Sequence, residues 1–145
     1  MSVLNPPADM PRILPHLIYE DVGVAVEWLC RVFGFSERAW VRHTDAGGRV
    51  TRTQMQVLDS VLTVGAPGAH DLASPSRGVS SMLYVYVDDV DAHYARAVSS
   101  GAAIVMPLGT RDFGDRNYQT RDPEGHQWIF GQHVADVDLH DHISA

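Results

Sequence analysis

The chain has 145 residues, 45% of them hydrophobic and 20% charged, a composition that is typical of a single soluble globular domain. Its formal net charge of −7 argues against non-specific binding of nucleic acid. All 11 basic residues are arginine, which excludes Schiff-base chemistry because that chemistry requires a lysine.

Compartment signals in the sequence indicate a cytoplasmic protein. The only cysteine, Cys30, excludes an internal disulfide and fits a reducing compartment. Residues 1–12 have neither the basic nor the apolar segment of a signal peptide. No apolar run reaches the roughly 18–20 residues that a membrane span requires. We therefore expect partners other than membranes and nucleic acid.

The first half of the chain predicts a β-α-β-β-β module over about residues 13–66, preceded by a flexible arm at residues 1–12. The helix is expected to begin after Asp21, a good N-cap residue, and to end at Gly34. Its apolar stripe consists of Val22, Ala25, Val26, Leu29, Val32 and Phe33. Strands are expected over residues 13–19, 35–43, 50–58 and 61–65.

The second half repeats this order over about residues 81–133, after a linker at residues 67–80 that contains proline, glycine and serine. The helix is expected to begin after Asp88 or Asp89 and to end at Gly101. Strands are expected over residues 81–87 and 103–108, with a glycine- and aspartate-containing loop over 109–115. Residues 134–145 are interpreted as an acidic, histidine-containing tail.

A β-hairpin over residues 116–133 closes the second module. Its turn is Asp122-Pro123-Glu124-Gly125, where proline restricts φ and glycine accepts the positive φ that closes the turn. The arms are residues 117–121 and 127–133. Along the second arm the alternation of side chains places Trp128, Phe130 and Gln132 on one face and Ile129 and His133 on the other.

The order of these motifs resembles the vicinal oxygen chelate superfamily, which includes glyoxalase I, bleomycin-resistance proteins and extradiol dioxygenases. The resemblance covers residues 13–133 and rests on the two modules, on Phe33-Gly34-Phe35, and on Asp122-Pro123-Glu124-Gly125-His126. The Gly-His-x-Trp form of the last strand is most similar to the PhnB-like branch. The resemblance implies an α+β fold, with two βαβββ modules that form an incomplete barrel around a cavity. It also implies a homodimer, and exchange of modules between chains stays open.

Metal-dependent relatives place His, Gln or Glu ligands on the first and last strands of each module. Counted from the strand–helix junctions, the first-strand positions of the two modules fall on Leu14 and Met82. Counted from the hairpin turn, the last-strand position of the second module falls on Phe130, or on Ile129 if the strand is one residue out of register. The last strand of the first module, residues 61–65, contains no Asp, Glu or His. The resemblance therefore implies that a family-type metal site is missing, and we expect no cofactor.

Histidines are the other candidate metal ligands. His16 lies one pleat along from Leu14 on the same predicted face, but a lone histidine on a strand is more often a hydrogen-bonded pocket residue. His126 is interpreted as a turn residue, and His133 lies on the face opposite Phe130. The remaining histidines are interpreted as surface or tail residues: His43, His70, His93, His140 and His142.

The predicted cavity lining is aromatic and mostly apolar. It consists of Leu14, His16, Ile18, Met82, Tyr84, Tyr86, Trp128 and Phe130. Arg116 and Tyr118 are expected to reach the cavity mouth, and Arg111 with Asp112 belongs either to a lid or to a plain exposed loop. Such a lining suits a planar or amphipathic organic molecule, held by stacking and a few hydrogen bonds.

Two functions of different classes are consistent with this cavity. The first is a non-catalytic protein that binds or sequesters a small aromatic or amphipathic molecule, and the negative net charge favours a cationic drug. The alternative is a divergent metal-dependent lyase, isomerase or dioxygenase built around His16, which requires a divalent metal and two further ligands. A pure interaction partner is a third possibility that no residue favours.

Overall fold

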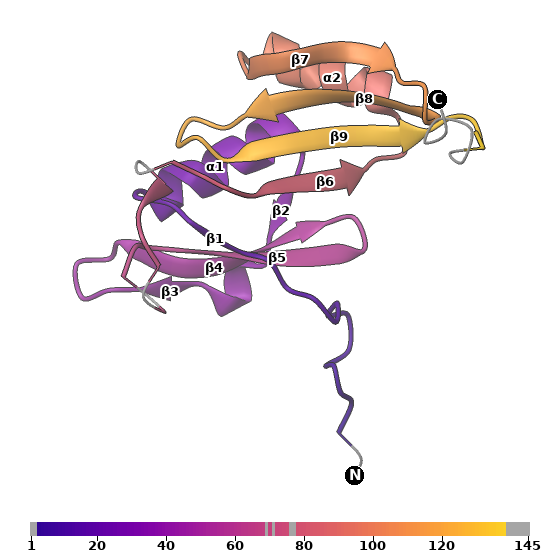
Figure 1. The fold of residues 1–145 in the computed structure, drawn as a ribbon. Helices are drawn as coiled ribbons and strands as arrows, with labels where there is room; N and C mark the ends of the chain where they lie inside the picture. The colour runs from indigo at the N-terminus through magenta and orange to yellow at the C-terminus, as the bar shows by residue number, and fades with distance from the viewer. Residues whose placement is uncertain (1–2, 69, 71, 76–77, 139–145) are drawn as a thin grey trace. The chain divides into compact units, whose positions relative to one another are not determined.

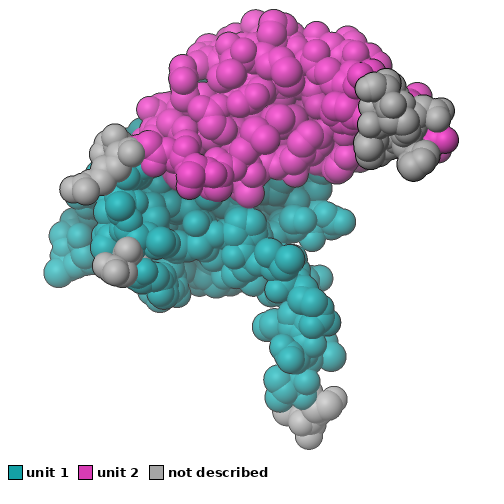
Figure 2. Space-filling model, in the orientation of Figure 1, with its two compact units in different colours: residues 1–77 teal, residues 78–145 magenta. Residues whose placement is uncertain are grey.

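The computed structural model describes residues 3–68, 70, 72–75 and 78–138. The chain divides into two compact units, Met1–Arg77 and Gly78–Ala145, which Figure 2 shows in different colours. Each unit contains one sheet and one α-helix (Figure 1). The α+β fold with two βαβββ modules is therefore confirmed, and within the described residues neither sheet closes into a barrel.

The helix of unit 1, α1 (Val22–Phe33), begins and ends where its capping residues predict. The side chain of Asp21 accepts a hydrogen bond from the backbone N–H of Val24 at 3.1 Å. Gly34 ends the helix in the left-handed conformation, with φ of 76°, which glycine adopts without strain. The predicted apolar stripe is confirmed, because the buried residues of α1 are Val22, Ala25, Val26, Leu29, Val32 and Phe33.

The sheet of unit 1 has the order β1-β5-β4-β2, and β3 also pairs with β4. Its strands are β1 (His16–Ile18), β2 (Ser36–Glu37), β3 (His43–Thr44), β4 (Val50–Val57) and β5 (Ser60–Gly65). β1 runs parallel to β5, whereas β4 pairs antiparallel with β5, β2 and β3. The register places His16 beside Thr63, and Thr63 beside Gln54, across three neighbouring strands.

The strand predicted over residues 35–43 is wrong in its middle. The chain leaves β4 after β2 and forms a 3-10 helix, Ala39–Val41, before it returns as β3. The backbone N–H of Val41 bonds to the carbonyl of Arg38 at 3.1 Å instead of to a neighbouring strand. Trp40 is 75% exposed and lies under the guanidinium of Arg38, so its apolar character does not indicate a strand.

The two faces of this sheet differ in character. One face carries buried apolar side chains, including Leu17, Met55, Leu62 and Val64, and α1 contacts β4. Because successive residues of a strand point to opposite faces, the other face carries His16, Arg52, Gln54 and Thr63. This polar face is the open one, and it positions the candidate site.

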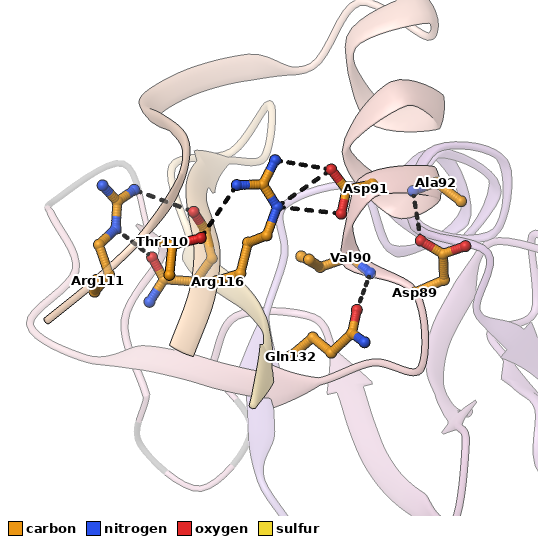
Figure 3. Close-up of polar contacts among 9 residues, drawn as sticks. Asp89, Val90, Asp91, Ala92, Thr110, Arg111, Arg116 and Gln132 are labelled. Carbon is orange, nitrogen blue, oxygen red and sulfur yellow. Dashed lines mark hydrogen bonds and ion pairs between the residues drawn. The ribbon is translucent and has the colours of Figure 1, made fainter. Parts of the chain in front are cut away.

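Unit 2 contains a four-stranded sheet with the order β6-β9-β8-β7. Its elements are β6 (Met82–Tyr86), α2 (Val90–Ser99), β7 (Ala103–Thr110), β8 (Asp115–Arg121) and β9 (Gln127–His133). Asp89, rather than Asp88, caps α2 and accepts from Ala92 N–H at 3.0 Å (Figure 3). Gln132 of β9 accepts from Val90 N–H at 3.0 Å, which ties the start of α2 to the sheet (Figure 3).

The closing hairpin agrees with its predicted turn and second arm. Gly125 has φ of 98°, and its N–H bonds to the carbonyl of Asp122 at 3.0 Å. The Asp122 carboxylate accepts from the backbone N–H groups of Glu124 and His126 and from the Trp128 indole. The loop predicted over 109–115 is shorter in the structure, because Gly109 pairs with Asn117 and extends β7.

Within the described residues, no helix combines the length and the apolar character that crossing a membrane demands.

Candidate ligand-binding site

Two cavities that share lining residues lie within unit 1, on the open face of its sheet. The larger has a volume of about 520 Å³ and is lined by Leu14, His16, Arg52, Gln54, Thr63, His70 and Leu72. The smaller, of about 420 Å³, is lined by His16, His43, Thr51, Arg52, Gly65, Ala66, Pro67 and His70. Both volumes lie in the range of small-molecule sites, and His16, Arg52 and His70 line both cavities.

His16 is held at the centre of this face by its neighbours. Its Nδ1 lies 2.5 Å from the Thr63 hydroxyl oxygen, and its ring packs edge-on against His70 with ring centroids 5.6 Å apart. Gly65 makes room for the imidazole, since a Cβ at that position would lie 3.0 Å from His16 Cε1. The other ring nitrogen, Nε2, is buried and has no hydrogen-bond partner among the described residues.

Burial lowers the pKa of His16 below its usual 6.5, and the nearby His70 and Arg52 lower it further. The imidazole is therefore neutral at neutral pH. A neutral imidazole has one N–H donor and one lone-pair acceptor, so His16 offers the cavity a hydrogen-bonding group and not a charge.

The rest of the lining supplies an amide, a guanidinium and apolar walls. Gln54 Oε1 is buried and, like His16 Nε2, has no partner among the described residues. Arg52 Nη2 lies 3.4 Å from His43 Nε2. No carboxylate is among the described residues that line either cavity. The negative net charge of the chain is therefore not found in these cavities, and the preference for a cationic drug that it suggested does not apply to them.

The described residues do not fit a family-type metal ion. No group of three His, Cys, Asp or Glu side chains that could hold a metal occurs among them. The carried-over position Leu14 is apolar, and Nδ1 of His16 is occupied by Thr63. His43 and His70 are the other imidazoles that line these cavities, but they do not form with His16 a group of three that could hold an ion.

The open face of unit 2 carries a different polar cluster, centred on Asp115, which is 3% exposed. The phenols of Tyr84 and Tyr86 donate to Asp115 Oδ2 at 2.6 and 2.9 Å, and His133 Nδ1 lies 2.7 Å from Asp115 Oδ1. Asn117 donates to the Tyr84 hydroxyl at 3.0 Å. The carboxylate therefore has three donors, which leaves it little capacity for a ligand.

Protonation in this cluster follows from the same contacts. Burial raises the pKa of Tyr84 to about 12, with a further contribution from the bond to Asp115. Burial also raises the pKa of Asp115, but the bonds from Tyr84, His133 and Tyr86 outweigh it and hold that pKa below its usual value. Hydrogen bonds to Asp115 and then to Asp136 raise the pKa of His133, whose two ring nitrogens both face carboxylates.

The predicted lining residues Trp128 and Phe130 lie on the other face of the unit 2 sheet, so their expected common face with Tyr84 and Tyr86 is wrong. Tyr118, which was expected at the cavity mouth, lies on that other face as well. β6 pairs with β9 so that Tyr84 lies beside Ile129 and Tyr86 beside Gly131. The residues Tyr118, Trp128 and Phe130 are 0% exposed. The His93 ring of α2 packs on Phe130 with ring centroids 4.1 Å apart, and His93 Nδ1 lies 2.6 Å from the Tyr118 hydroxyl. His93 is therefore a packing residue and not a surface one.

The other predicted residues are distributed between the units. His16 lines the cavities of unit 1, where Ile18 is only 6% exposed. Met82 and Tyr86 are 47% and 58% exposed on β6 of unit 2. Arg116 forms an ion pair with Asp91 of α2 at 2.8 Å (Figure 3).

Arg111 does not form a lid. Its guanidinium bonds to Asn117 Oδ1 at 2.8 Å and to the carbonyl of Pro107 at 2.7 Å. Figure 3 shows the side chain directed toward its own hairpin, so it is part of the edge of the sheet.

Sequence reasoning missed most of the polar cavity lining in unit 1. Arg52, Gln54 and Thr63 lie on strands that were predicted, and His70 was interpreted as a surface residue. A signal was present, because Arg52 and Gln54 alternate with buried Thr53 and Met55 along β4. Alternation of this kind identifies an open sheet face, but it does not show that the face is hollow.

The fold and the site define the class of protein to which this chain belongs. Its two βαβββ modules belong to the Glyoxalase/Bleomycin resistance protein/Dioxygenase superfamily, whose family model matches residues 10–130. Membership of the PhnB-like branch stays a prediction.

Individual relatives share sequence or fold over most of their length. TioX from Micromonospora sp. ML1 is 34% identical, with a TM-score of 0.73 over 86% of this chain and 99% of that chain. The uncharacterized protein Rv0887c of Mycobacterium tuberculosis (strain ATCC 25618 / H37Rv) is 30% identical over 141 residues, 93% of this chain and 81% of that protein. TnmS3, an antibiotic binding protein from Streptomyces sp. CB03234, shares the fold, with a TM-score of 0.64, 22% identity, and coverage of 83% of this chain and 93% of that chain.

Proposed function

We propose that this chain binds a small aromatic or amphipathic organic molecule in the cavities of unit 1, without a metal and without converting the molecule chemically. Three buried polar side-chain atoms lack a hydrogen-bond partner among the described residues: His16 Nε2, Gln54 Oε1 and Arg38 Nε. The observation that carries the proposal is that two of them, His16 Nε2 and Gln54 Oε1, belong to side chains that line the larger cavity. Buried polar groups are nearly always hydrogen-bonded, so a molecule that offers donors to these two side chains would complete their bonding.

Apolar and aromatic neighbours of these atoms support the organic character of the ligand. Leu14 and Leu72 line the larger cavity, and the rings of His16 and His70 offer faces and edges for a planar group. The superfamily contains proteins of this type, since TnmS3 is described as an antibiotic binding protein. At 22% identity the likeness extends to the fold, and the proposed ligand follows from the residues of this chain.

The alternative is an enzyme built around His16, and one observation favours it. The lowered pKa leaves the imidazole neutral, and its Nε2 has no partner among the described residues, so the ring can accept a proton as a general base does. Metal analysis of the purified protein discriminates between the two functions. We expect substoichiometric metal, whereas one divalent ion per chain that is lost in His16→Ala would replace the binding proposal with the enzyme.

A thermal-shift screen with planar aromatic compounds tests the binding proposal. Because a ligand that binds only the folded state raises the melting temperature, compounds that occupy the cavity should raise Tm in proportion to their affinity. Leu14→Trp fills the larger cavity and should abolish the shift. Leu4→Trp, at a side chain that is 64% exposed, is the matched control and should leave the shift unchanged. A screen without hits, or hits that survive Leu14→Trp, would count against binding in this cavity.

We also propose that the chain works as a homodimer in the cytoplasm. The dimer is supported by the apolar surface of Met82, Tyr84 and Tyr86 on β6, which association would bury, and the compartment is supported by the single Cys30. Sedimentation over a hundredfold range of protein concentration tests the first part, and a monomer throughout would contradict it. Fractionation of the host cell tests the second.

A further inference from the structure

The proton of the Thr63 hydroxyl decides which nitrogen of His16 is open as an acceptor. Thr63 Oγ1 lies 2.5 Å from His16 Nδ1 and 3.3 Å from the carbonyl oxygen of Pro15. The hydroxyl has one proton. If it donates that proton to Pro15, it can accept a proton from Nδ1–H, and both contacts are hydrogen bonds. If it donates to Nδ1 instead, the hydroxyl makes no bond to Pro15. The arrangement with more hydrogen bonds therefore places the ring proton on Nδ1.

The position of that proton fixes the character of Nε2. His16 is neutral near pH 7, because burial, His70 and Arg52 lower its pKa. A neutral ring with its proton on Nδ1 has a bare lone pair on Nε2. No described residue donates to this nitrogen. His16, a lining residue of the cavity, therefore has a buried acceptor that needs a donor.

A second acceptor lies on the same face of the sheet. Gln54 Oε1, the carbonyl oxygen of the amide, is buried and has no donor among the described residues. The register places Gln54 beside Thr63, and Thr63 beside His16, so both acceptors belong to side chains that line the larger cavity, from β4 and β1. Two acceptors in one cavity cannot satisfy each other, because neither has a proton to give.

We propose that the ligand of unit 1 presents hydrogen-bond donors, N–H or O–H, to His16 Nε2 and Gln54 Oε1. This inference rests on the proposed binding function and names the chemical class of the ligand. Leu14 and Leu72 provide apolar walls for its body, and the guanidinium of Arg52 disfavours an ammonium group as the donor. The ligand is thus a neutral aromatic molecule with a hydroxyl or amide N–H, rather than a carboxylate or an amine cation.

A matched pair of probes tests this class directly. 2-Naphthol has an O–H donor, and 2-methoxynaphthalene has the same ring system without one. The wild-type protein should bind 2-naphthol about tenfold more tightly, a ratio typical of one hydrogen bond to a buried acceptor. Heteronuclear NMR titration gives both affinities and, through the amides of Thr63 and Gly65, shows that the probe lies in this cavity.

Variants assign the preference to the two acceptors. Because the single O–H of 2-naphthol donates to one acceptor, the substitution of that acceptor, His16→Leu or Gln54→Leu, should reduce the ratio of the two affinities, and the double variant should bring it to about one. Gln54→Glu keeps an acceptor at this position and should keep the preference. Gln127→Leu on β9 of unit 2 is a matched control and should leave the ratio of the two affinities unchanged. Circular dichroism melts confirm that each variant is folded.

The outcomes separate the class of ligand from the binding function itself. If both naphthalenes bind the cavity equally, or if 2-methoxynaphthalene binds more tightly, the donor class is overturned while binding in unit 1 stands. If neither probe nor any compound of the aromatic screen shifts the amide NMR signals of Thr63 and Gly65, the proposed binding function is wrong. The proposed class of ligand is then wrong as well. The tautomer has its own measurement, because ¹⁵N NMR distinguishes protonated from bare ring nitrogens. A protonated Nε2 in the free protein would overturn the inference whatever the probes do.

Discussion

The open sheet faces of unit 1 and unit 2 carry similar chemical groups, which are paired differently. In unit 2 the phenols of Tyr84 and Tyr86 and the imidazole of His133 all bond to one buried carboxylate, Asp115. In unit 1 the buried His16 Nε2 and Gln54 Oε1 have no partner among the described residues. A polar network that is satisfied internally stabilises its own arrangement, whereas buried acceptors without donors favour a molecule that supplies them. We therefore propose a structural role for the Asp115 cluster and a binding role for the His16 face.

Glycines show the same contrast in the space they leave. A Cβ at Gly131 would lie 2.7 Å from the Tyr84 hydroxyl, so this glycine admits a ring that is bonded to Asp115. A Cβ at Gly65 would lie 3.0 Å from His16 Cε1, so that glycine admits a ring whose Nε2 has no partner among the described residues. Each face has one glycine under one ring, and the two rings differ in what they bond.

The largest effect is expected from removal of the carboxylate in unit 2. Asp115→Ala leaves three donors without their shared acceptor at a position that is 3% exposed. It should lower the free energy of unfolding by about 2–3 kcal/mol. Urea unfolding measures this change, with Asp9→Ala in the N-terminal arm as the matched control. A loss equal to that of the control would mean that the network contributes nothing to stability.

A smaller loss is expected when the glycine under Tyr84 is filled. Gly131→Ala forces the Tyr84 ring away from Asp115 and should cost about 1–2 kcal/mol of unfolding free energy. Gly65→Ala should lower the unfolding free energy less. The His16 ring that it displaces has one side-chain hydrogen bond among the described residues, to Thr63. Urea unfolding of the two variants side by side measures the difference. A larger cost at Gly65 would reverse the assignment of structural and binding roles.

Little loss of stability is expected from Gln54→Leu in the absence of ligand. The substitution removes an acceptor that has no donor among the described residues, and replacement of such a group by an apolar one changes stability by about 0–1 kcal/mol in either direction. Binding of 2-naphthol should weaken in the double variant His16→Leu/Gln54→Leu, which removes both acceptors. A loss of stability similar to that of Asp115→Ala would show that Gln54 has an internal partner after all.

The smallest effects are expected in the pH dependence of stability, and they have opposite signs in the two units. The pKa of His133 is raised in the folded state, so its contribution is present below pH 6.5 and is lost as pH rises through the raised pKa. The pKa of His16 is lowered, so folding loses stability as pH falls from 6.5 through the lowered pKa. The groups that face His16 in this titration are His43, His70 and Arg52.

Melting temperatures measured against pH check these signs. Relative to wild type, His133→Gln should be least stable at low pH, and His16→Leu should gain at low pH. Parallel curves for wild type and either variant would exclude a titrating role for that histidine. Gln119→Leu, on β8 and without a titrating group, is the reference for substitution alone.

Much of the fold could be predicted from short segments of sequence. Asp21 and Gly34 delimit α1 through bonds to residues at most a few positions away. Asp122 and Gly125 close the hairpin in the same manner. Residues 39–41 show where such reasoning stops, since their apolar side chains suggested a strand and the backbone forms a 3-10 helix. Nothing local in that segment indicates that Trp40 lies under Arg38 instead of in a core.

The site was less predictable, because it depends on register between distant strands. The sequence showed that Trp128, Ile129 and Phe130 alternate between two faces of a strand. It did not show which of these residues shares a face with Tyr84. A shift of one residue exchanges the faces, and the parallel pairing of β6 with β9 places Ile129 beside Tyr84. In the same manner, the pairing of β1 with β5 brings His16 to Thr63, 47 positions along the chain.

The amino-acid sequence alone indicated most of the helices and strands, their caps and turns, and the resemblance to the superfamily, because those signals are bonds and side-chain patterns within short segments of the chain. Only the tertiary structure decided that Tyr118, Trp128 and Phe130 pack in the core, that Asp115 gathers the donors of unit 2, and that His16 and Gln54 have open acceptors in unit 1. The physical reason is that a polar atom's pairing depends on which strands lie side by side, and hydrogen bonds between strands join residues far apart in the chain.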